Sequence, residues 1–319
     1  MSFSGMVKEE LSKNISLAHH CQRAELAAFL NVFGRLVRKD SGEQSLIIRT
    51  ENESVIRKCF TILRKSFSID TDIQIRDISP SKKGKAYQIE IVQPAQIQQL
   101  LQGTKMDVDE EGGDTLYLSN AILVQKSCCK RAFIRGAFLS SGSMSDPSKG
   151  YHFEIVCPDE RKAIQLQEMI CSFHINAKIV RRKKLYVVYV KEGAQIVDML
   201  AIMEANISLM NLENIRIIKE MRNTINRKVN CDTANINKTV NAAYKQREDI
   251  ELIEKKIGFH NLKEGLAELA ELRLQYPEAT LKELGMMLSP QVGKSGVNHR
   301  LRKLSMIADS LRENEEELL

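Results

Sequence analysis

The feature that most constrains the fold is an internal repeat of about 100 residues. The spacing of apolar residues predicts the same order of elements twice: helix, strand, helix, two strands and a helix. In the first copy these elements are expected near Arg23–Phe33, Ser45–Thr50, Ser54–Lys65, Asp72–Ile78, Ala86–Val92 and Ala95–Gln102. In the second copy they are expected near Arg131–Ser141, Tyr151–Val156, Glu160–Phe173, Ala177–Val180, Leu185–Val190 and Ala194–Met203.

This repeat predicts a duplicated α+β domain over residues 1–210. Its two halves, of αβαββα type, are expected at about 20–105 and 127–205. The acidic, glycine-containing segment Asp107–Asp114 is interpreted as the connection between them.

Each half carries a basic hairpin between its last two strands. The cations concerned are Lys82, Lys83, Lys85, Arg181, Arg182, Lys183 and Lys184. Taken singly, a lysine-rich turn is best explained as a solvated turn. Because the two hairpins occupy matching positions, they together predict a platform for the DNA backbone. The alternative, a domain that binds other proteins and carries only solvated turns, stays open.

The chain changes character after Met203, where asparagine, lysine and arginine become frequent as far as Gly258. We expect a linker over residues 211–222 and an all-α domain over 223–319. Asn261 is expected to cap a helix that ends before Pro277.

A helix-turn-helix motif is predicted over residues 279–312. Thr280 and Glu283 have the spacing of a capping box, in which a hydroxyl and a carboxylate satisfy the free amides at a helix start. The first helix should end near Leu288, because Pro290 cannot continue it. Gly293 then offers a permissive cap for the second helix.

The second helix of the motif is amphipathic and basic. Apolar residues at 3.6-residue spacing form one stripe: Val297, Leu301, Leu304, Ala308 and Leu311. No acid occurs between Glu283 and Asp309. The residues predicted to bind DNA are Thr280, Lys282, Lys294, Ser295, Asn298, His299, Arg300, Arg302 and Lys303. Among them Asn298, His299 and Arg302 are expected to read bases. The plainer interpretation is a solvated surface helix.

Composition excludes several classes of protein. With 319 residues, 43% hydrophobic and 28% charged, the chain is long enough for two or three cores, and its net charge of +6 is modest, so the basic signal is local. The N-terminal residues include acids and no long apolar run, so we expect no signal peptide and no membrane anchor, and a cytoplasmic, nucleoid-associated protein.

Nucleotide and metal sites are not expected either. Gly293, Lys294 and Ser295 match the end of a phosphate-binding loop, but Leu288 stands where its first glycine is needed. The seven cysteines are scattered and never spaced as C-x-x-C, which argues against zinc and against a disulfide framework. We expect buried thiols in a reducing cytosol, surface positions for His19 and His20, and no cofactor.

The helices that open the two copies contain LAAFLNVFG (Leu26–Gly34) and IRGAFLSSG (Ile134–Gly142). Both resemble the signature helix of LAGLIDADG homing endonucleases. This resemblance implies two helices packed closely through small residues, and a metal-binding acid just before each closing glycine. Phe33 and Ser141 occupy those positions, and neither can supply a carboxylate. We therefore predict no catalytic residues, no metal site and no nuclease activity; an active metal-dependent endonuclease is the alternative.

The whole chain resembles the WhiA family. The most specific pieces are RAFIRGAFLSSGSMSDPSKGYHFEI (Arg131–Ile155), NCDTANINKTVNAA (Asn230–Ala243) and the terminal helix pair. The resemblance implies a sequence-specific transcriptional regulator linked to cell division, chromosome segregation and, in spore formers, sporulation. Its implied partner is double-stranded DNA, with RNA polymerase or another regulator as a further candidate. The sequence has no heptad seam and does not reveal the oligomeric state.

Overall fold

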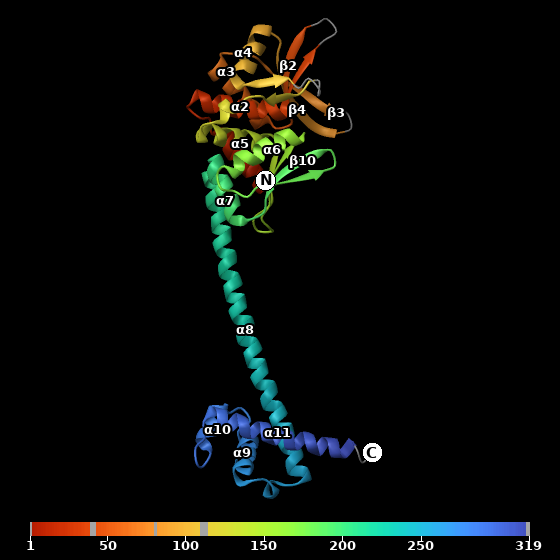
Figure 1. Cartoon of the computed structure of the whole chain (residues 1–319), viewed down its shortest axis with the longest axis vertical. Coiled ribbons are helices and arrows are strands. Elements are labelled where there is room, and N and C mark those ends of the chain that lie inside the picture. Colours follow the sequence, from red (N-terminus) through yellow and green to blue (C-terminus); the bar gives the residue numbers. More distant parts are fainter. Residues whose placement is uncertain (1, 39–42, 80–81, 109–113, 317–319) are drawn as a thin grey trace. The chain divides into compact units, whose positions relative to one another are not determined.

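The chain folds into two compact units, Met1–Glu220 and Met221–Leu319. The computed structural model describes residues 2–38, 43–79, 82–108 and 114–316 (Figure 1). No helix within these ranges combines the length and the hydropathy needed to cross a membrane.

The first half of unit 1 is a four-stranded antiparallel sheet with helices packed on it. Its elements are α1 (Phe3–Lys13), α2 (His19–Phe33), β1 (Gly34–Arg38), β2 (Gln44–Thr50), α3 (Glu53–Phe67), β3 (Ile73–Ser79), β4 (Lys82–Ile91) and α4 (Pro94–Thr104). The strand order is β1-β2-β4-β3. In the β2–β4 register, Leu46 faces Ile91 and Ile48 faces Ile89, so one face of the sheet is apolar and lies in the core.

The second half repeats this plan. Its elements are β5 (Met106–Val108), β6 (Leu116–Leu118), the 3-10 helix η1 (Ala121–Val124), α5 (Ser127–Ser141), β7 (Gly142–Met144), β8 (Phe153–Cys157), α6 (Glu160–Cys171), β9 (Lys178–Arg182), β10 (Leu185–Val190) and α7 (Gly193–Met203). The sheet order β7-β8-β10-β9 matches that of the first half.

The predicted duplication is therefore confirmed, and each half gains one further sheet strand. Outside the repeat, α1 precedes the first half, and β5, β6 and η1 stand before α5. Strands β1 and β7 directly follow α2 and α5 and were not predicted, because each is short and starts with glycine, which disfavours strands. Of the expected connecting segment, Asp107 and Val108 lie in β5. Residues 109–113 lie outside the described residues.

The two halves meet along α2 and α5, which lie side by side (Figure 1). Gly136 of α5 explains how closely they approach. A methyl group at this position would lie 2.7 Å from the backbone oxygen of Glu25 and 2.9 Å from the Cβ of Ala28. The small residues of this helix pair therefore allow backbone-to-backbone packing.

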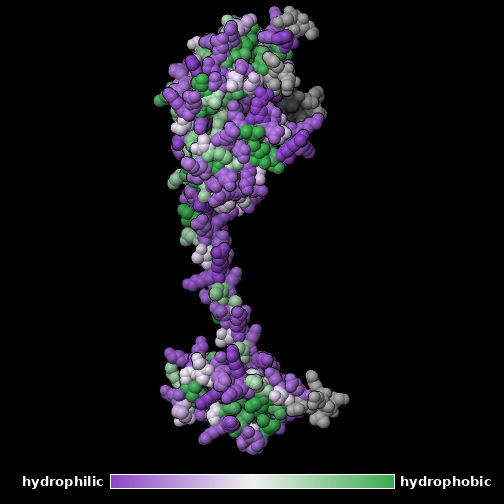
Figure 2. Space-filling model, in the orientation of Figure 1, coloured by the Kyte–Doolittle hydropathy of each residue, from purple (hydrophilic) through white to green (hydrophobic). Residues whose placement is uncertain are grey.

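Helix α8 (Asn206–Lys256) contributes residues to both units. Leu212 near its start is buried in the core of unit 1, and Ile250 and Ile253 near its end are buried in the core of unit 2. Residues 211–222, expected as a linker, are helical and lie inside α8. The side chains of residues 221–242 are exposed, and Figure 2 shows this stretch as mostly hydrophilic.

Unit 2 is all-α, with η2 (Phe259–Asn261), α9 (Glu264–Gln275), α10 (Leu281–Met287) and α11 (Lys294–Glu316) following the end of α8. The expected cap by Asn261 is wrong, because Lys263 is the N-cap of α9. Asn261 lies in η2 instead, and its side-chain amide donates to the carbonyl of Ile257 at 2.6 Å, just beyond the end of α8. The amide of Asn261 thus satisfies a free carbonyl rather than free amides.

Candidate nucleic-acid interface

The capping box at the start of α10 is confirmed. The backbone amide of Thr280 donates to Glu283 Oε2 at 2.7 Å, and the amide of Glu283 donates to Thr280 Oγ1 at 3.3 Å. The hydrogen bond from the Thr280 backbone holds the pKa of the Glu283 carboxyl below its ordinary value. Both partners are exposed, so this box fixes where α10 begins without using the core.

The turn between α10 and α11 folds tightly onto Gly285. The amide of Val292 donates to the Gly285 carbonyl at 2.9 Å, and a methyl group on Gly285 would lie 2.1 Å from the carbonyl oxygen of Val292. Gly293 accepts from the amide of Val297 at 3.1 Å, in agreement with the predicted cap. These contacts set the direction in which α11 leaves the turn.

Helix α11 buries the predicted stripe. Val297, Leu301, Leu304 and Ala308 are buried in the core of unit 2, and Leu311 packs against it. Helix α11 begins at Lys294, three residues before the first residue of that stripe. The stripe therefore determines which side of α11 faces solvent.

Most of the predicted DNA-binding residues of α11 reach solvent. By the 3.6-residue period, Ser295, His299 and Arg302 lie opposite the stripe, whereas Lys294 lies beside it. Five are exposed on α11: Lys294, Ser295, His299, Arg302 and Lys303. Asn298 is half-buried. We call these six residues the α11 polar face. Thr280 and Lys282 are exposed at the start of α10.

Arg300 differs from this set. Its Nη1 atom donates to the carbonyl of Gly265 on α9 at 3.1 Å, and its side chain is half-buried. The guanidinium is thus engaged by α9, and Arg300 does not belong to the α11 polar face. The 3.6-residue period places Arg300 beside the buried stripe, but the period alone does not tell which neighbour it contacts.

The positive field of α11 has a defined end. Asp309, the first acid after Glu283, pairs with Arg312 at 2.7 Å. Arg312 also binds the buried Asp249 of α8 at 2.6 Å, and this hydrogen bond is the main reason why the pKa of Arg312 is raised. The carboxylate of Asp309 is therefore neutralised by Arg312.

The second basic hairpin is exposed but does not present one charged face. Arg181, Arg182, Lys183 and Lys184 all reach solvent. The Arg181 guanidinium lies 5.9 Å from the centre of the Tyr186 ring, whereas Arg182 Nη1 lies 3.6 Å from Glu154 Oε2. Because neighbouring side chains of a strand point to opposite faces, these two arginines serve different surfaces.

The first hairpin is described only in part. Lys82 and Lys83 belong to β4 by their backbone, and Lys85 is exposed. The side chains of Lys82 and Lys83 lie outside the described residues, as does Ser81.

The positions equivalent to nuclease acids lie at the ends of α2 and α5. Ser141 Oγ donates to the carbonyl of Val156 at 2.7 Å, and Phe33 packs against the core. A cavity of about 870 Å³ opens beside these helix ends, and its lining includes Phe33, Arg35, Arg49, Glu53 and Ser140.

Glu53 is a carboxylate of this cavity. It accepts from Arg57 at 2.6 Å and from the Tyr87 hydroxyl at 3.2 Å, and the hydrogen bond from Arg57 is the main cause of its lowered pKa. Glu51 also lines the cavity, and among the described residues no group of three or more metal-ligating side chains gathers here.

Sequence reasoning missed one cluster in unit 1. His20, Cys21, Cys128 and Cys129 come together from the first turns of α2 and α5. Their pairs are far apart in the chain, and no local spacing links them. A signal does exist in the repeat: His20 and Cys21 precede Gly34 by the same distances as Cys128 and Cys129 precede Gly142.

The expectation of buried thiols is correct for four cysteines and wrong for three. Cys21, Cys59, Cys129 and Cys157 are buried, whereas Cys128, Cys171 and Cys231 are exposed. Burial raises the pKa of Cys157 and of Cys129 to about 12 each, with the neighbouring Cys21 also contributing at Cys129. Isolated thiols in these places would be protonated at neutral pH.

Similarity to known proteins extends over nearly the whole chain. Residues 19–107 match the WhiA N-terminal LAGLIDADG-like domain, residues 130–222 the WhiA LAGLIDADG-like domain, and residues 225–308 the WhiA C-terminal HTH domain. The "Probable cell division protein WhiA" of Lachnoclostridium phytofermentans is 57% identical over 313 residues, which cover 98% of this chain and 100% of that protein.

Further relatives agree. The protein of the same name from Clostridium acetobutylicum is 46% identical over 313 residues, covering 98% of this chain and 99% of that protein. The crystal structure of full-length DUF199/WhiA from Thermatoga maritima shares 24% identity and superposes with a TM-score of 0.58, covering 97% of this chain and 99% of that one. The chain therefore belongs to the WhiA family.

Proposed function

We propose that this protein is a sequence-specific regulator that binds double-stranded DNA and acts in bacterial cell division. The observation that carries the proposal is the α11 polar face, which stands opposite a buried stripe and lies in a stretch without acids between Glu283 and Asp309. The match of residues 225–308 to a helix-turn-helix domain and the names of the related cell division proteins support it.

The chemistry of the face suggests a division of labour. In a helix-turn-helix, residues near the start of the second helix reach base edges in the major groove. Arginine suits guanine and asparagine suits adenine, so Asn298, His299 and Arg302 read bases in this proposal. The residues assigned to phosphates are Thr280, Lys282, Lys294, Ser295 and Lys303. Arg300 positions α9 against α11.

Unit 1 is assigned a non-enzymatic role. Phe33 and Ser141 cannot ligate a hard metal ion, and the proposal includes no nuclease activity. The cations of the two hairpins, of which Lys85, Arg181, Arg182, Lys183 and Lys184 are exposed, add sequence-independent affinity for DNA in this proposal. The proposal also includes a role in chromosome segregation and, in spore formers, in sporulation. In this proposal the protein acts at the nucleoid, with RNA polymerase or another regulator as its partner.

One selection experiment tests the central claim. The full-length protein is incubated with a randomised duplex DNA pool and magnesium at near-physiological salt, bound molecules are sequenced, and the pool is inspected for cleaved ends. We expect one motif to be enriched and the DNA to stay intact. Arg302→Ala should weaken binding to that motif by about 1–3 kcal/mol and relax one base position.

Arg64→Ala is the matched control, since Arg64 is an exposed arginine of unit 1 paired with Asp70. It should leave the motif and the affinity unchanged. Failure to enrich any motif would contradict sequence-specific binding. Cleaved ends that disappear with a chelator would instead support the metal-dependent endonuclease.

A further inference from the structure

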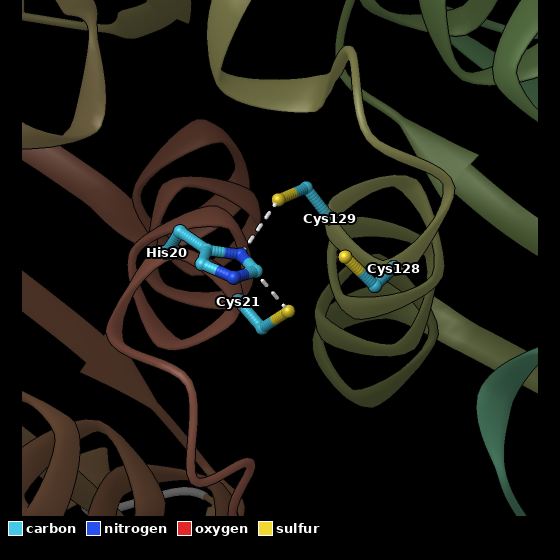
Figure 3. Close-up of side chains that lie close together, drawn as sticks. All are labelled: His20, Cys21, Cys128 and Cys129. Atoms are coloured by element: carbon cyan, nitrogen blue, oxygen red, sulfur yellow. Dashed lines mark hydrogen bonds between the residues drawn. The ribbon is translucent and has the colours of Figure 1, made fainter.

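We propose that His20, Cys21, Cys128 and Cys129 form a tetrahedral site for zinc that joins the first turns of α2 and α5. One ligand atom from each residue lies within 4.8 Å of all the others. Figure 3 shows the imidazole of His20 between the sulfurs of Cys21 and Cys129, with the sulfur of Cys128 directed into the same space. His20 Nδ1 lies 3.2 Å from Cys129 Sγ and 3.3 Å from Cys21 Sγ.

The donor set selects the class of metal. Three thiolates and one imidazole form the Cys₃His set of structural zinc sites, in which no coordination position stays open for a substrate. Neighbouring ligand atoms of such a site stand roughly 3.5–3.8 Å apart, given metal–ligand bonds of about 2.0–2.3 Å. The two distances from His20 Nδ1 lie close to this spacing and the others do not exceed 4.8 Å, so small side-chain movements would complete the tetrahedron.

The backbone around the cluster favours thiolates. All four residues lie in the first turn of α2 or α5, and neither N-cap residue, Ala18 or Lys126, uses its side chain to cap its helix. The amides of Cys21 and Cys129 donate to the carbonyls of Ala18 and Lys126, so it is the positive ends of both helix dipoles, without a side-chain cap, that favour negative charge at the cluster. Three thiolates with one Zn²⁺ carry a net charge of −1, which these helix ends stabilise.

Burial supports a structural site with an open route for the ion. Cys21 and Cys129 are 5% and 3% exposed, and they pack with Ala24 and Ala132 in a small apolar cluster. His20 and Cys128 are exposed on the outer side. The inner ligands are thus shielded from water, and the outer ligands can receive the ion from solvent.

Binding has a defined proton balance. Each thiol gives its proton to the buffer as its sulfur binds zinc, and His20 coordinates as the neutral imidazole. No oxidant is consumed. The bound ion would link α2 to α5 and so clamp the two halves of unit 1 at the end opposite Gly34 and Gly142.

The test uses the full-length protein, reduced and freed of metal. Cobalt is titrated in, and thiolate-to-cobalt charge-transfer absorption together with intense tetrahedral d–d bands is expected at one cobalt per chain. Zinc should then displace the cobalt and raise the thermal unfolding temperature of the protein. None of these readouts involves DNA, so the zinc site is tested independently of the proposed DNA binding.

Variants locate the ligands. Cys128→Ser and His20→Ala change exposed residues, which makes them safe for folding, and both should lose or strongly weaken the cobalt bands. Cys129→Ser should abolish them. Cys231→Ser is the matched control, because Cys231 is an exposed cysteine of α8 outside the cluster, and it should bind cobalt as the unchanged protein does.

Two outcomes would overturn the proposal. One is a folded, reduced protein that shows no thiolate–cobalt absorption. The other is absorption that persists unchanged in both Cys128→Ser and His20→Ala. Circular dichroism of each variant establishes that it is folded before its spectrum is compared.

Discussion

Arg135 of α5 donates to both carboxylate oxygens of Glu25 of α2, through Nε at 3.0 Å and through Nη2 at 3.2 Å. Both side chains are buried, and Lys58 adds a second cation at 2.5 Å from Glu25 Oε1. Burial lowers the pKa of Lys58, whereas Glu25 and Glu204 keep the pKa of Arg135 raised. The ion pair thus crosses the contact between the two halves of unit 1.

Arg135→Ala should destabilise the protein strongly. The change removes the bidentate partner of the buried Glu25 carboxylate but leaves Lys58 paired with it, so the loss should lie near the lower end of the roughly 3–5 kcal/mol for a buried pair broken from one side. Urea unfolding followed by circular dichroism measures the loss. Arg64→Ala, which removes an exposed pair with Asp70, should cost at most about 1 kcal/mol. Equal losses in the two variants would show that the buried pair is not important for stability.

Gly136→Ala should weaken the contact between α2 and α5. The added methyl group meets the Glu25 backbone oxygen and Ala28, so the helices must separate, at about 1–3 kcal/mol. Gly150→Ala is the control, because nothing lies within 4 Å of a methyl group there. A thermal unfolding temperature lowered only in Gly136→Ala is expected. An unchanged Gly136→Ala protein would contradict the close packing.

Gly285→Ala should disrupt the helix-turn-helix and with it the binding of the selected DNA motif. The methyl group would collide with the Val292 carbonyl, which is backbone and cannot rotate away. Gly293→Ala has free space around the new methyl group, so apart from a small loss at the N-cap of α11 it should bind nearly as the unchanged protein does. Fluorescence anisotropy with labelled duplex compares the two. Equal affinities of the two variants for the duplex would show that the turn does not depend on Gly285.

The capping box should make unit 2 sensitive to acid. The folded-state pKa of Glu283 is depressed by its hydrogen bond to Thr280, so its stabilising effect is complete above the unfolded-state pKa of about 4.3 and is lost as the pH falls through the folded-state value. Glu283→Gln keeps a hydrogen-bond acceptor but cannot titrate. Urea unfolding from pH 7 down to about pH 3 should therefore show a smaller loss of stability in Glu283→Gln. Identical pH dependence would refute this role.

Neutralising the second hairpin should reduce the salt dependence of DNA binding. Each phosphate contact contributes about 0.9 to the slope of log K against log salt, and because Arg181 and Arg182 face different surfaces we expect a change of about 1–2. The variant replaces Arg181, Arg182, Lys183 and Lys184 by glutamine. The control replaces the exposed cations Arg64, Lys65, Lys105 and Lys149. An unchanged slope in the hairpin variant would favour the protein-interaction module.

Features with a short period were predictable from the sequence. The duplicated order of helices and strands, the capping box at Thr280 and the buried stripe from Val297 to Ala308 all follow from spacing or from contacts a few residues apart. The sequence did not predict strands β1 and β7, because they are short segments directly after helices. They are ordered by pairing with β2 and β8 rather than by the strand preference of their own residues.

The tertiary structure decided everything that depends on how helices meet. The inward turn of Arg300 toward Gly265, the ion pair between Glu25 and Arg135, and the gathering of His20 with Cys129 join residues that no local period relates. The sequence by itself determined which face of each helix is apolar, since that is a property of residue spacing. Which residues then touch depends on where two helices cross and how closely, and packing of the whole core sets both.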